Sequence, residues 1–157
     1  MRLVYRIIPI LIIFIAASGI GSPQEREIFY GDYSNNLLYK YVDVPVIALS
    51  QDLKMGIIGK VRVGLIKKGS GRIIFDKRTI VDTATILAAV NSVAFAEKNE
   101  KLSGYDYFIG FDLNSDSVSG GSTGAGISEG LIALARNKTI KEGTIITSEI
   151  APGRIRN

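Results

Sequence analysis

The stretch Ser117-Val-Ser-Gly-Gly-Ser-Thr-Gly-Ala-Gly126 determines how the second half of this chain folds, because an apolar-periodic segment follows it directly. A glycine-rich turn before such a segment marks a strand that ends and a helix that begins. Ser122 lies in this turn, at or just before the first helical turn. The N–H groups there have no intrahelical partners, and the helix dipole adds positive potential. A hydroxyl and free N–H groups can therefore face one substrate atom.

Downstream of the turn, the sequence predicts one helix and one strand. The helix is expected over residues 123–136, with Ile127, Leu131, Leu134 and Ala135 on one face. A last strand is expected over residues 143–150.

Upstream of the turn, strands and one further helix are expected. The segments with strand composition are 42–49, 56–67, 72–76 and 105–113. Pro45 indicates an edge strand, and the turn at 68–71 predicts that 56–67 and 72–76 pair as a hairpin. Asp82 is the expected N-cap of a helix that runs to about Lys98, with Ile86, Ala89, Val90 and Val93 on one face. This order of elements predicts a two-layer domain of the α+β or α/β class.

The amino-acid composition excludes several kinds of functional site. The chain has 157 residues, about one domain, and contains neither histidine nor cysteine. Disulfides, thiolate metal sites and the usual catalytic zinc sites are therefore excluded, and we expect no metal and no cofactor. The formal charge is +4, from 19 Lys+Arg against 15 Asp+Glu, and no long basic run is present. Nucleic acid is therefore not an expected partner.

The N-terminus has the pattern of a targeting segment. Two arginines, Arg2 and Arg6, precede an apolar run over residues 7–17, and small residues follow it. We expect residues 1–22 to be a signal peptide or a signal anchor that holds the protein at a membrane. Residues 23–38 are polar and are expected to be a linker, and residues 39–157 form the folded domain. The domain is then extracytoplasmic, either secreted or membrane-anchored.

Three interpretations of the bare serine turn remain open. Ser122 can be a helix N-cap, with the glycines only making the turn. The glycines can form a phosphate-binding loop, although no Walker lysine follows them. Alternatively, Ser122 is a nucleophile, and since the chain has no histidine, lysine is the usual substitute as its base.

The sequence resembles the Lon-type Ser–Lys peptidase domain, most closely the exported or membrane-anchored archaeal Lon-like peptidases. The likeness rests on Ser119-Gly-Gly-Ser-Thr-Gly-Ala-Gly126, on the helix that ends near Arg136, and on Gly143-Thr-Ile-Ile-Thr-Ser-Glu-Ile150. It covers roughly residues 42–155. Gly121 departs from the family's usual proline, Thr123 from a small apolar residue, and Ser148 from a frequent glycine.

The resemblance implies an α+β, two-layer Lon proteolytic-domain-like fold that is incomplete at its C-terminus. It implies that Ser122 is the nucleophile and that Thr147 orients the lysine base. Gly120, Gly121 and Thr123 would form the turn that holds the oxyanion. The family's lysine follows the last strand, so the resemblance places it beyond Asn157. Neither Lys138 nor Lys141 matches its position.

The expected function is therefore that of a serine endopeptidase domain without an ATPase module, acting on a peptide or protein through an acyl-enzyme on Ser122. The chain by itself is expected to be inactive or nearly so. The alternative is a catalytically inactive, exported Lon-like domain with a binding or assembly role. The family often forms rings, which implies a homo-oligomer.

Overall fold

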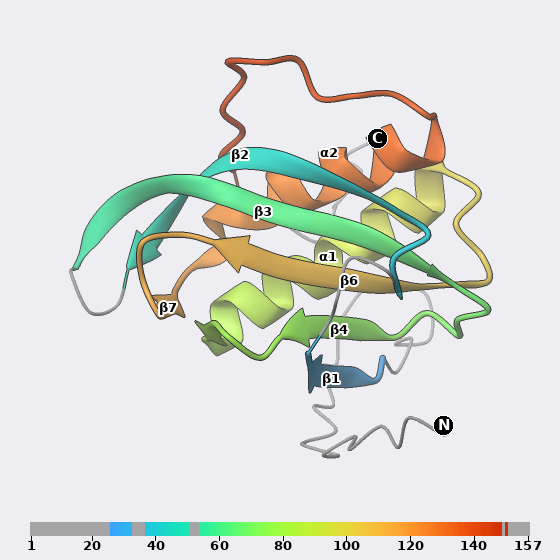
Figure 1. The fold of residues 1–157 in the computed structure, drawn as a ribbon, viewed down its shortest axis with the longest axis horizontal. Helices are drawn as coiled ribbons and strands as arrows, with labels where there is room; N and C mark the ends of the chain where they lie inside the picture. The colour runs from blue at the N-terminus through green and yellow to red at the C-terminus, as the bar shows by residue number, and fades with distance from the viewer. Residues whose placement is uncertain (1–25, 33–36, 51–53, 149, 151–157) are drawn as a thin grey trace, which may run out of the picture.

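A computed structural model describes residues 26–32, 37–50, 54–148 and 150. They form a mixed α+β domain in which two helices lie on one face of a five-stranded sheet (Figure 1). The strands of this sheet are β1 (Ile28–Gly31), β2 (Lys40–Ser50), β3 (Met55–Lys67), β4 (Ile73–Asp76) and β6 (Tyr105–Asp112). The helices are α1 (Thr83–Asn99) and α2 (Gly124–Ala135).

The strand order is β1-β4-β6-β3-β2, with antiparallel pairing through β2, β3 and β6 and parallel pairing of β4 with both β6 and β1. Strand β2 therefore lies at one edge of the sheet, as Pro45 predicts. Strand β1 lies at the other edge, inside the segment that the sequence predicts to be a linker. That part of the expected linker therefore belongs to the folded sheet.

The predicted hairpin between 56–67 and 72–76 is wrong. Strand β6 lies between β3 and β4, and Ile109 is paired with Val63 on one side and with Phe75 on the other. The chain returns from β4 to β6 through α1, the kind of long crossover that parallel strands require. A short turn after β3 is therefore compatible with a partner strand that begins much further along the chain, since Lys67 pairs with Tyr105.

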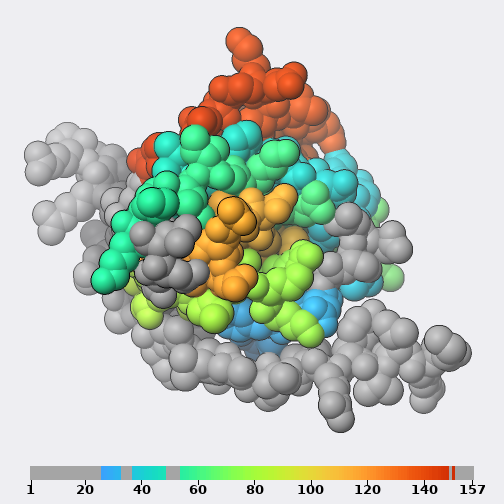
Figure 2. Space-filling view, turned by 60° about the vertical axis from the view of Figure 1, so that its left-hand side comes forward, coloured from blue at the N-terminus to red at the C-terminus, as the bar shows by residue number. Residues whose placement is uncertain are grey.

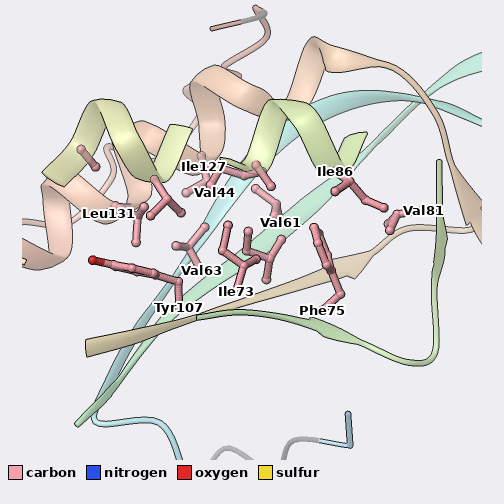
Figure 3. Packing of buried hydrophobic residues seen from close by; sticks show 14 of the residues in the cluster. Val44, Val61, Val63, Ile73, Phe75, Val81, Ile86, Tyr107, Ile127 and Leu131 are labelled. Carbon is pink, nitrogen blue, oxygen red and sulfur yellow. The ribbon is translucent and has the colours of Figure 1, made fainter. Parts of the chain in front are cut away.

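Both helices begin and end close to where the sequence predicts. Asp82 is the N-cap of α1, and its side chain accepts a hydrogen bond from the Thr85 N–H at 2.8 Å. Their apolar faces meet the inner face of the sheet around Val61, Val63 and Tyr107 (Figure 3). The helical residues buried in this core are Ile86, Ala89, Val93, Ala96, Ile127, Leu131 and Leu134. The predicted helical faces are thus confirmed, with Val90 and Ala135 only partly buried.

A two-stranded parallel pair connects the sheet to the serine turn. Strand β5 (Ile80–Val81) precedes α1, and β7 (Ser117–Val118) precedes the turn. Because the two strands pair, the N-terminus of α1 and the start of the turn lie side by side.

The predicted strand over 143–150 is not formed in the residues that the structure describes. This segment makes a single parallel bridge, between Ile146 and Val46 of β2. The targeting segment at 1–22 lies outside the described residues and stays a prediction. Among the described residues, no helix has both the length and the apolar character needed to cross a membrane.

Candidate functional site

The serine turn is a single 3₁₀ turn, Gly121–Thr123, that continues directly into α2. Gly120 begins it with a φ of +89°, a backbone conformation that favours glycine. Further along, Gly126 lets α2 approach β2 closely, since a Cβ at this position would lie 2.6 Å from Val46 Cγ1. The glycines therefore have two separate purposes: Gly120 shapes the turn, and Gly126 brings it against β2.

Ser122 is partly exposed, and its hydroxyl donates a hydrogen bond to the Ile47 carbonyl of β2 at 3.2 Å. The N-cap of α2 is Thr123, which makes no side-chain capping bond. The capping interpretation of Ser122 is therefore wrong. Instead, the hydroxyl lies at the edge of the sheet, at the start of a helix.

Thr147 lies beside Ser122, although 25 residues separate them in the sequence. Its hydroxyl donates to the Ser122 carbonyl at 3.5 Å, and the Ser148 N–H donates to the same carbonyl at 3.0 Å. The Ser148 carbonyl in turn accepts from the Ala125 N–H at 2.9 Å. The segment that contains Thr147 thus runs between β2 and the serine turn, and Figure 2 shows this red part of the chain against the cyan and green of β2 and β3.

Two backbone N–H groups of the turn are available for an anion. In the described part of the chain, no hydrogen bond engages the N–H of Gly121 or of Ser122. The Gly124 N–H bonds to the Gly121 carbonyl, and the Gly120 N–H faces the Asp82 carboxylate at 3.3 Å. Of the predicted turn residues, Gly121 and Ser122 itself can therefore offer free donors, whereas Gly120 has its donor occupied.

Helix α1 supports the turn through three polar side chains that sequence reasoning did not assign to the site. Asp82 accepts from the Ser119 hydroxyl at 2.6 Å, and the Thr85 hydroxyl lies 3.1 Å from the Gly120 carbonyl. Ser92, fully buried, lies 2.7 Å from the Gly124 carbonyl. The one available signal was the polar character of positions 85 and 92 on an otherwise apolar helix face.

No lysine amino group is hydrogen-bonded to Ser122 in the part of the chain that the structure describes. Lys138 and Lys141 lie in the exposed loop after α2. The described residues also contain no group of His, Cys, Asp or Glu side chains that could hold a metal ion. The functional groups that the described residues bring to the site are therefore the Ser122 hydroxyl, two N–H groups that no described residue engages, and the hydroxyl of the neighbouring Thr147.

The hydroxyl of Thr123 is buried without a hydrogen-bond partner among the described residues. The residue is 0% exposed, and among the described residues its Oγ1 is the one buried side-chain polar atom without a partner. Burying an unpaired hydroxyl costs about 1–3 kcal/mol. We therefore expect Thr123→Val, which keeps the shape, to raise the free energy of unfolding by about 1 kcal/mol in urea denaturation.

The matched control is Thr85→Val. Thr85 is equally buried, but its hydroxyl bonds the Gly120 carbonyl, so this substitution should lower stability by about 1 kcal/mol. If Thr123→Val destabilised the protein as much as Thr85→Val does, the Thr123 hydroxyl would have to have a partner.

A scan of the sequence against models of known protein families gives no match, and a search of the curated proteins gives none either.

Proposed function

We propose that this chain carries the serine part of a Lon-type Ser–Lys peptidase site, on a Lon proteolytic-domain-like version of its α+β fold. The observation that carries the proposal is the contact between Thr147 and Ser122, two positions that match the family's motif and lie far apart in sequence. The N–H groups of Gly121 and Ser122, which no described residue engages, support it, because an oxyanion needs donors at this point.

In the proposed reaction, a neutral lysine amine takes the proton of the Ser122 hydroxyl, and the oxygen attacks the carbonyl carbon of a peptide bond. The charge that develops on the carbonyl oxygen is stabilised by the N–H groups of Gly121 and Ser122. The lysine then passes its proton to the leaving amine, and water hydrolyses the ester on Ser122. To react, the hydroxyl must exchange its bond to the Ile47 carbonyl for one to the amine.

The lysine comes from outside the described residues in this proposal. Thr147, whose hydroxyl is exposed beside Ser122, is the side chain that would orient the amine. The substrate is a peptide or protein, and the domain acts outside the cytoplasm, secreted or anchored through residues 1–22. A homo-oligomer remains part of the same proposal.

A second candidate function is binding or assembly without catalysis. Two observations favour it: the Ser122 hydroxyl already has a structural partner in β2, and no described lysine is bonded to it. In that case Ser122 would serve to fix the turn against the sheet edge.

Labelling with a fluorophosphonate separates the two functions. The protein is incubated with the probe at pH 9 to 10, with and without a tertiary alkylamine that can act as an external base. We expect slow labelling without the amine and labelling of Ser122 that is at least about tenfold faster with it, since a general base typically contributes 100-fold or more when positioned. Peptide mass spectrometry identifies the labelled serine.

Two variants are the controls, and a third tests Thr147. Ser122→Ala should remove the amine-dependent labelling, whereas alanine at the exposed loop residue Ser103 should leave it unchanged. Thr147→Val should leave the folded structure intact, because Thr147 is exposed. The rate of Ser122 labelling in this variant shows whether the Thr147 hydroxyl contributes to the reaction. Labelling of Ser122 no faster than that of other exposed serines would overturn the peptidase proposal and leave the binding function.

A further inference from the structure

We infer that Asp82 is a positioning residue for the serine turn, in addition to capping α1; this inference rests on the proposed function. Its carboxylate caps α1 and also holds the two residues that precede the turn. Asp82 accepts from the Thr85 N–H at 2.8 Å, which is the capping bond. It also accepts from the Ser119 hydroxyl at 2.6 Å and faces the Gly120 N–H at 3.3 Å from both oxygens.

The backbone of Asp82 is held beside the end of β7 independently of its side chain. The Asp82 N–H donates to the Val118 carbonyl at 3.2 Å, as the next rung after the paired strands β5 and β7. The N-cap of α1 therefore lies beside the end of β7, the strand that leads into the turn. A side chain of aspartate length at this position reaches both α1 and the turn.

The bonds to Ser119 and Gly120 control which N–H groups are free. Gly120 has a φ of +89°, and its N–H is directed to the carboxylate while its carbonyl lies 3.1 Å from the Thr85 hydroxyl. With Gly120 held on both sides, the next two N–H groups, of Gly121 and Ser122, have no acceptor among the residues that the structure describes. Without the carboxylate, Gly120 would gain freedom of rotation, and the direction of these two donors would no longer be fixed.

The ionised form of Asp82 is the one that makes these bonds. Partial burial raises the pKa of the carboxyl, but the hydrogen bonds from Ser119, Thr85 and Gly120 outweigh it and hold the pKa below its ordinary value of 3.8. The groups that lower this pKa are hydroxyl and backbone N–H donors that point at one carboxylate.

Asp82→Ser separates the two roles of the side chain. Serine is as good an N-cap as aspartate, so α1 keeps its cap, but its hydroxyl is too short to hold Ser119 and Gly120 as well. We expect the Gly120 amide to exchange its hydrogen at least about tenfold faster in this variant, while the amides of α1 keep their wild-type rates. Asp82→Asn, which retains the length and an acceptor oxygen, should restore slow exchange in part.

The rate of Ser122 labelling by the fluorophosphonate in the presence of amine is the second measurement. We expect it to fall about tenfold in Asp82→Ser and less in Asp82→Asn, because misdirected N–H donors stabilise the oxyanion-like transition state poorly. The loss should appear in the labelling step and not in the thermal stability of α1.

The outcomes separate the inference from the function on which it rests. Unchanged Gly120 exchange in Asp82→Ser, or unchanged labelling with Ser122 reactive in the wild type, overturns the positioning role. If Ser122 is unreactive in the wild type, the peptidase proposal fails, whereas fast Gly120 exchange in Asp82→Ser still supports Asp82 as the residue that holds the turn.

Discussion

Replacing Asp106 with alanine is expected to lower the free energy of unfolding by about 3 kcal/mol, because it removes a buried carboxylate that accepts four hydrogen bonds. The Asp106 side chain is only 2% exposed. One of its oxygens accepts from the N–H groups of Ser70 and Arg72 at 2.8 and 3.0 Å. The other accepts from the Arg72 guanidinium at 2.6 and 2.9 Å. The carboxylate thus joins the turn before β4 to β6.

The effect of Asp106 should depend on pH in a defined direction. Burial raises the pKa of this carboxyl, but the hydrogen bonds from Arg72 and Ser70 outweigh it and keep the pKa below its ordinary value of 3.8. A group with a lowered pKa stabilises the fold above its ordinary value, and this contribution is lost as the pH falls through the lowered pKa. The difference in free energy of unfolding between wild type and Asp106→Ala should therefore be largest at pH 6 and should decrease below pH 3.8.

Urea denaturation at both pH values is the measurement, and Asp116→Ala is the control. Asp116 is exposed, so its removal should change stability by no more than about 0.5 kcal/mol. A cost for Asp106→Ala below about 1 kcal/mol, or one that stays constant down to pH 3, would contradict the role given to the network.

Gly126→Val is expected to lower the free energy of unfolding, because it forces α2 away from β2. A Cβ at Gly126 would already lie 2.6 Å from Val46 Cγ1, and valine adds two further carbons. Overpacking of this kind costs about 1–3 kcal/mol. Since α2 begins two residues after Ser122, the same displacement should also weaken the bond between Ser122 and the Ile47 carbonyl.

A double mutant tests the cause. Val46→Ala removes the carbon that the new side chain meets, so Gly126→Val should cost less in the Val46→Ala background than in the wild type. Glu129→Val places the same residue on the exposed face of α2 and should be nearly neutral. Additive costs for positions 46 and 126 would show that the close approach is not the source of the loss.

Local features of the chain were predictable to the extent that they depend on neighbouring residues. The alternation over 56–67 gave β3, Asp82 gave the start of α1, and the apolar spacing of Ile127, Leu131 and Leu134 gave the buried face of α2. Each of these signals comes from the intrinsic geometry of one element. The predicted hairpin failed because a turn signal says that the chain reverses, not which strand becomes its partner.

At the candidate site, too, local features could be predicted and contacts between distant segments could not. The glycine-rich turn, the helix that follows it and the lack of any histidine or cysteine to assist Ser122 can all be read from the residues alone. The folded structure was needed to show that β6 separates β3 from β4, that Asp82 holds Ser119 and Gly120, and that Thr147 reaches the Ser122 carbonyl. These contacts join residues far apart in the chain, and they form because the sheet and the helices must bury their apolar faces together.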